Sequence, residues 1–89
     1  MKLKYNFVIR EIDDTPIAVA VGDDSKFFNG VVKLNSSGRV IFEMINGNDV
    51  TLDDIVSNLI DKFDIDKDMA EKSAKLFLDE LRKSDLVIE

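Results

Sequence analysis

The chain has 89 residues, contains no cysteine and no histidine, and carries a net charge of −6 at pH 7. This length fits one domain with a single modest core, so we expect one domain over residues 1–89. The missing residue types exclude disulfides, zinc–thiolate sites and the usual general base. Seven acidic residues and only one basic residue, Lys62, lie between positions 43 and 66. This acidity argues against a nucleic-acid partner, because a phosphate backbone is bound by clustered Lys and Arg.

The opening residues also bear on where the protein works. Residues 1–13 hold two lysines, Lys2 and Lys4, but lack the apolar run of a secretory signal. Elsewhere, no segment approaches the roughly 18 apolar residues that a membrane-spanning helix needs. We therefore expect a cytoplasmic protein with no membrane partner.

The first third of the chain is patterned for three short strands, Phe7–Ile12, Ile17–Val21 and Phe28–Leu34. Turn-forming clusters at Asp13–Pro16 and Gly22–Ser25 separate them. Because the connections are short, an antiparallel sheet is favoured. The third strand comes last in this sheet, so one of its edges is unpaired unless the C-terminal tail, residues 86–88, pairs with it.

Three helices are predicted after the strands. The first is capped by Asn35 or Ser36 and runs to about Ile45, where Asn46-Gly47-Asn48 ends it. A second begins at its N-cap Thr51, and a third runs from its cap Asp66 to about Lys83. Three strands followed by three helices exclude a βαβ fold. They predict a winged-helix-like α+β domain, with a three-stranded antiparallel sheet followed by three helices.

The spacing of apolar residues predicts which helix faces are buried. In the first helix the predicted stripe is Val40, Ile41, Met44 and Ile45. In the second it is Leu52, Ile55, Val56, Leu59 and Phe63. In the third, the core face is Ala70, Ala74, Phe77, Leu78 and Leu81.

The third helix carries more apolar surface than one packed face requires. Met69, Ser73 and Leu76 widen its apolar arc to roughly 200°, against the roughly 100° of an ordinary amphipathic helix. Either the sheet or the tail covers this flank, or the flank borders a groove that receives a partner peptide. An extended peptide can add to an open strand edge by main-chain hydrogen bonds. The same edge could instead pair with a second copy and give a homodimer.

A family resemblance rests on Arg10 in the first strand and on three segments, VKLNSSG (32–38), IFEMING (41–47) and FLDELRKSDL (77–86). With these markers, nearly the whole chain resembles the PqqD-like family, the leader-peptide recognition element of ribosomally synthesised and modified peptides (RiPPs). The resemblance implies three antiparallel strands and three helices. It also implies binding of the leader of a precursor peptide and its presentation to a RiPP-modifying enzyme. In the quinone-cofactor pathway of the family's name, that enzyme is a radical S-adenosylmethionine (SAM) protein.

The resemblance also implies a site. In the family, the leader adds as a strand to the third strand and lies against the third helix. This selects Val31, Val32 and Lys33 for main-chain pairing, and it selects for side-chain contact Met69, Lys72, Ser73 and Leu76. The sequence departs from the family pattern at Ser84-Asp85-Leu86, where a glycine usually precedes the leucine. That departure concerns the end of the third helix.

Two other kinds of function fit the sequence less well. A DNA-binding winged helix would read DNA with its third helix, but residues 66–83 hold five basic and five acidic groups, a poor match to phosphate. An enzyme would need groups that the chain does not supply, so we expect no catalytic residue and no cofactor. Residues 64–68 imitate the start of a calcium loop, yet Met69 and Lys75 replace the required Gly and Glu, so no metal site is expected. An adaptor role without a peptide substrate stays open.

Overall fold

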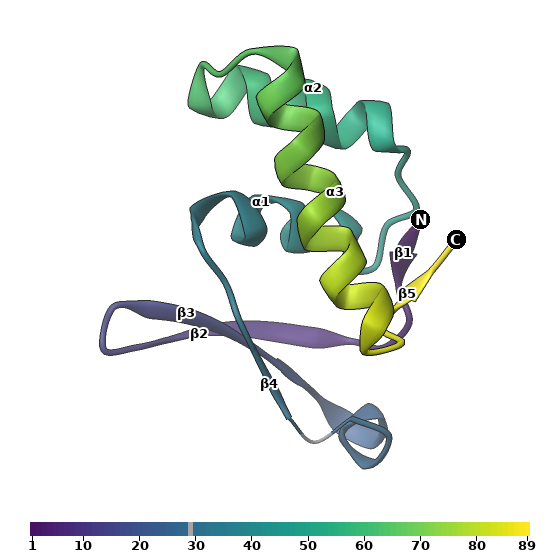
Figure 1. Cartoon of the computed structure of the whole chain (residues 1–89). Helices are drawn as coiled ribbons and strands as arrows, with labels where there is room; N and C mark the ends of the chain where they lie inside the picture. Colours follow the sequence, from purple (N-terminus) through teal and green to yellow (C-terminus); the bar gives the residue numbers. More distant parts are fainter. Residues whose placement is uncertain (29) are drawn as a thin grey trace.

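The computed structural model describes residues 1–28 and 30–89. Its elements in chain order are β1 (Lys2–Leu3), β2 (Phe7–Ile12), β3 (Thr15–Ala20), the 3₁₀ helix η1 (Gly22–Lys26), β4 (Val31–Lys33), α1 (Ser36–Ile45), α2 (Leu52–Phe63), α3 (Lys67–Lys83) and β5 (Val87–Ile88). Strands β2, β3 and β4 form an antiparallel sheet with β3 in the middle. All three α-helices lie on one side of that sheet (Figure 1). The predicted fold class is therefore confirmed.

The β2–β3 hairpin turns more tightly than predicted. Its two turn residues, Asp13 and Asp14, have φ angles of 50° and 64°, as in the type I′ turns that match the twist of two-residue hairpins. The predicted turn at Asp13–Pro16 is thus too long, because Thr15 and Pro16 already belong to β3. β3 ends at Ala20, one residue earlier than predicted.

The third strand of this sheet is shorter than the predicted Phe28–Leu34. The chain after β3 forms η1, and the backbone N–H of Phe28 donates to the carbonyl of Asp24 at 3.2 Å. That bond holds Phe28 in the turn, so β4 spans only Val31–Lys33. Asn29, which belonged to the predicted strand, lies outside the described residues.

The predicted helix starts are confirmed by the caps. The Asn35 side chain accepts a hydrogen bond from the N–H of Gly38 at 2.7 Å, which fixes Asn35 as the cap of α1. Thr51 and Asp54 form a reciprocal capping box at the start of α2. The side chain of Asp66 caps α3 by accepting a hydrogen bond from the N–H of Met69 at 2.8 Å. Each helix therefore begins where a short polar side chain satisfies its first free N–H groups.

The core lies between the helices and the sheet. Its largest fully buried side chains are Phe42, Ile41, Ile45, Ile55, Leu59, Leu78 and Leu86. The predicted stripe of α1 is partly wrong, since Phe42 is buried whereas Val40 and Met44 are half-buried. Phe42 faces the sheet, where its ring meets Phe7 edge-on at a centroid distance of 5.2 Å. In α2, Phe63 is exposed rather than buried, because it ends the helix beyond the packed turns.

The C-terminal tail packs back as predicted, and it pairs with β1. Strand β5 is antiparallel to β1, and the N–H of Lys4 donates to the carbonyl of Leu86 at 2.8 Å. The turn after α3 places Asp85 at φ 57°, so an aspartate adopts the left-handed conformation usually taken by glycine. Because the tail is committed to β1, it leaves the outer edge of β4 open (Figure 1).

Two further properties follow from the described residues. None of their helices is long and apolar enough to cross a membrane. The same residues contain no group of three or more acidic side chains placed to hold a metal ion.

Candidate functional site

The register of β4 decides which of its backbone groups are free. Val32 lies opposite Ala18 of β3, and the N–H of Leu34 donates to the carbonyl of Pro16 at 3.0 Å. In an antiparallel pair, residues alternate between bonding to the neighbour and pointing away from it. The backbone of Val32 therefore bonds to β3, whereas the N–H and C=O groups of Val31 and Lys33 point to the open edge.

A groove runs between this open edge and α3. One hollow of about 320 Å³ is lined by Phe28, Val31, Val32, Lys33, Phe77, Glu80, Leu81, Ser84 and Leu86. A second hollow of about 290 Å³ is lined by Asn35, Ser37, Ser73, Leu76, Phe77 and Glu80. Because Phe77 and Glu80 line both hollows, we treat the two as one feature and call it the edge groove. It follows the free edge of β4 toward the start of α1.

The wall of the edge groove depends on a close approach between α1 and α3. Gly38 is buried in the first turn of α1, and a Cβ atom placed there would lie 2.8 Å from Cε1 of Phe77. Real Cβ atoms essentially never come so close to another atom. Glycine at this position therefore gives the Phe77 ring the space it occupies between the two hollows.

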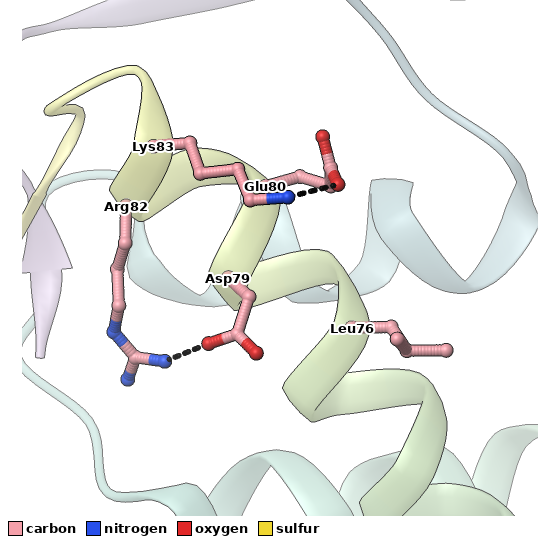
Figure 2. Close-up of a pocket in the computed structure, with 5 residues that line it drawn as sticks. All are labelled: Leu76, Asp79, Glu80, Arg82 and Lys83. Atoms are coloured by element: carbon pink, nitrogen blue, oxygen red, sulfur yellow. Dashed lines mark hydrogen bonds and ion pairs between the residues drawn. The ribbon is translucent and has the colours of Figure 1, made fainter.

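The solvent side of α3 next to the groove is charged but internally neutralised. Asp79 pairs with Arg82 at 2.9 Å, and Glu80 pairs with Lys83 at 3.4 Å (Figure 2). Arg82 also donates to Glu89, and this bond is the main reason that the pKa of its guanidinium lies above the usual value. Leu76 precedes these pairs along α3 and is 60% exposed. An apolar side chain thus stands uncovered at the mouth of the groove.

The structure brings most of the predicted site residues together. Of the seven, the groove is lined by Val31, Val32, Lys33, Ser73 and Leu76. Lys72 lies at another hollow on α3, which Leu76 also lines. Met69, which is 53% exposed, lines neither hollow of the edge groove. The sequence left open whether the sheet or the tail covers this flank of α3. In the structure Met69 and Leu76 are both exposed, while the role of all seven residues in binding stays a prediction.

Sequence reasoning missed several residues of the groove, chiefly Phe28, Glu80 and Leu81. Leu81 and Phe77 were assigned to the core face of α3 from their spacing. Both do face inward, but that face continues past the sheet edge, so Phe77 is only half-buried. Spacing along one helix does not show where the neighbouring sheet stops, and no other sequence signal marks this border.

These features define a small winged-helix-like α+β domain with an open strand edge beside its last helix. The family model for coenzyme PQQ synthesis protein D (PqqD) matches residues 11–87, and the chain belongs to this family. The solved structure described as TbiB1 in complex with the TbiA(beta) leader peptide shares the fold, with a TM-score of 0.71. The two sequences are 20% identical, and the match covers 97% of this chain and 93% of the other. None of the curated proteins compared with the chain matches it.

Proposed function

We propose that residues 1–89 act as one domain that binds the leader segment of a ribosomally made precursor peptide and presents the peptide to a modifying enzyme. Membership in the PqqD family supports this function, as does the likeness to a protein solved with a leader peptide. The observation that carries it is the unpaired edge of β4 next to the edge groove, which the chain's own tail leaves free. The enzyme in this proposal is a radical SAM protein or another RiPP-modifying enzyme in the cytoplasm.

The main chain of the leader would pair with β4. Val31 and Lys33 each offer one N–H and one C=O to a guest strand, whereas Val32 is already bonded to β3. Backbone bonds of this kind give affinity with little regard to sequence. Of the three β4 residues selected for main-chain pairing, we therefore propose that Val31 and Lys33 make the hydrogen bonds to the leader.

The side chains of the leader would supply specificity. Alternate residues of a strand point to the same face, so every second leader residue would enter the edge groove. There the apolar surface of Phe77 and Leu81 receives it, with the carboxylate of Glu80 at the α3 rim. Ser73 and Leu76 would contact the next part of the leader. Met69 and Lys72 would join only if the leader continues along α3 beyond the groove.

We assign the protein a carrier role rather than a catalytic one. A domain that holds both the leader and the enzyme raises the effective concentration of the substrate at the enzyme, and this needs no reacting group of its own. The chain supplies no histidine or cysteine to such a reaction. A homodimer through the β4 edge would compete with the leader for the same backbone groups.

Amide hydrogen exchange followed by NMR tests this proposal, using the synthetic leader of a candidate precursor peptide. At saturation, the N–H groups of Val31 and Lys33 are expected to exchange more slowly. The N–H groups of Val32 and Leu34 serve as internal controls, because both are already bonded to β3. Unchanged exchange at Val31 and Lys33 with the leader bound would refute strand addition. Protection of both without any peptide would indicate the homodimer instead.

A further inference from the structure

The three-stranded sheet has a second face, and among the described residues none of the three α-helices covers it (Figure 1). The inner face packs on the helices: Ala18 and Val32 join the core, and Glu11 reaches Arg39 of α1 at 2.8 Å. By the strand register, the opposite face carries Val8, Arg10, Ile12, Thr15, Ile17, Val19, Val31 and Lys33. We call these eight residues the outer sheet face.

The centre of the outer sheet face is apolar and partly exposed. Val8, Val19 and Val31 are direct cross-strand neighbours and form one row across the three strands. In the next row, Ile17 stands between Arg10 and Lys33 and is only 9% exposed. The long aliphatic stems of its two neighbours are suited to cover it. Val31, by contrast, is 54% exposed. The face thus presents apolar surface to solvent next to two cationic groups.

The charge of this face is opposite to that of the chain. The chain carries −6, yet the only charged residues of the outer sheet face are Arg10 and Lys33. Among the described residues, neither forms an ion pair. Arg39 and Arg82, in contrast, each contact two carboxylates. Two unpaired cations around an apolar centre complement a surface that offers carboxylates around an apolar patch. A second copy is a poor fit, because a two-fold contact of this face would bring the cations of both copies together.

A guest strand on β4 would enlarge the outer sheet face. Residues directly opposite each other in two paired strands point to the same side of the sheet. Guest residues opposite Val31 and Lys33 would therefore add a fourth column to the face, about 4.8 Å beyond β4. The face would then consist partly of this protein and partly of its bound peptide.

We propose that the outer sheet face is a second binding surface, which docks the modifying enzyme through an apolar patch of that enzyme rimmed by Asp and Glu. The enzyme contacts the outer sheet face and the outward side chains of the bound leader together, so it binds the loaded domain more tightly than the empty one. The joint contact rests on the proposed function, whereas the acidic, apolar character of the partner follows from the outer sheet face alone.

Binding of a purified candidate RiPP-modifying enzyme, measured by biolayer interferometry with and without saturating synthetic leader, tests this proposal. Arg10→Glu reverses one cation, and Val8→Thr makes the same strand more polar while keeping a β-branched side chain. Both residues lie on β2, the strand farthest from the leader edge. Lys62→Glu is the matched control, since it makes the same charge change on exposed α2 surface. Thermal unfolding checks that each variant is folded.

The expected result is that Arg10→Glu and Val8→Thr each weaken enzyme binding about fivefold or more, with the Arg10→Glu effect shrinking at high salt. Lys62→Glu should change it less than about twofold, and all three variants should bind the leader as the parent does. If the two outer-face variants match the Lys62→Glu control, the docking surface is wrong. If saturating leader does not tighten enzyme binding, the joint contact is wrong. A parent protein that fails to bind the leader at all would instead refute the proposed function.

Discussion

Replacing Lys33 by proline tests the open edge most directly. The N–H of Lys33 points away from β3 in the register, so proline removes it without breaking a bond of the existing sheet. Proline is tolerated at such outward positions of edge strands. Its fixed φ also suits extended backbone. The fold should therefore survive a change that deletes one donor from the proposed leader interface.

The size of the effect follows from the bond that is lost. A backbone hydrogen bond contributes a net 0.5–1.5 kcal/mol, roughly, and an acceptor left buried and unpaired costs about 1–3 kcal/mol. The leader carbonyl opposite Lys33 would be such an acceptor. Leader binding should therefore weaken by about 1–3 kcal/mol, which corresponds to a roughly 5- to 150-fold higher Kd at 25 °C.

Isothermal titration calorimetry with the synthetic leader measures this change. Lys33→Thr is the matched control, because it removes the same charge, keeps the N–H and introduces a β-branched residue that suits a strand. The threonine variant should bind within a few-fold of the parent, while the proline variant should not. Equal affinities for Lys33→Pro and Lys33→Thr, with both proteins folded, would show that this N–H does not take part in binding.

Three further changes probe the groove and the fold. Gly38→Ala should push the Phe77 ring into the edge groove, destabilising the protein by about 1–3 kcal/mol in chemical unfolding and weakening leader binding. Leu76→Asp should leave the unfolding free energy within about 0.5 kcal/mol of the parent's, because Leu76 is exposed. The same variant should lower the leader affinity several-fold in a calorimetric titration. Met69→Asp, which lies outside the groove, should lower the leader affinity less. The hydrogen bond from the backbone N–H of the α2 N-cap lowers the pKa of Asp54. Asp54 therefore stabilises the fold above its unfolded pKa, and this contribution is lost as the pH falls through the lower folded value. Asp54→Asn should accordingly show a shallower loss of stability in thermal melts below about pH 4; equal acid sensitivity of both proteins would contradict this.

The parts of the fold that local chemistry determines were predictable. The caps Asn35, Thr51 and Asp66 place all three helix starts correctly, because each cap acts on backbone only three residues away. Strand β2 was also placed correctly, at Phe7–Ile12. The apolar arc of the third helix was visibly wider than a core needs, but the sequence did not decide whether Leu76 is covered, and the structure leaves it exposed.

The parts that depend on distant segments were not predictable. The sequence left open whether the tail pairs with the third strand, and only the structure shows that it pairs with β1 instead. Likewise, Phe42 is buried because the sheet lies against that side of α1, which the stripe within α1 cannot reveal. The role of Gly38 depends on Phe77, nearly forty positions further along the chain, so the residues next to Gly38 in the sequence do not indicate it.

The pairing of β1 with β5 has a mechanical consequence. Leu86 lies in the core, forms part of the groove floor, and is tied through its carbonyl to Lys4. Bringing such distant segments together closes a loop of nearly the entire polypeptide, so the pairing of β1 with β5 depends on contacts between the two ends of the chain rather than on local sequence. If β1 and β5 separated, Leu86 would lose its bond to Lys4, and the part of the edge groove that Leu86 lines would become less rigid beneath a bound leader. The residence time of the bound leader would then depend partly on the residues of β1, although none of them lines the edge groove.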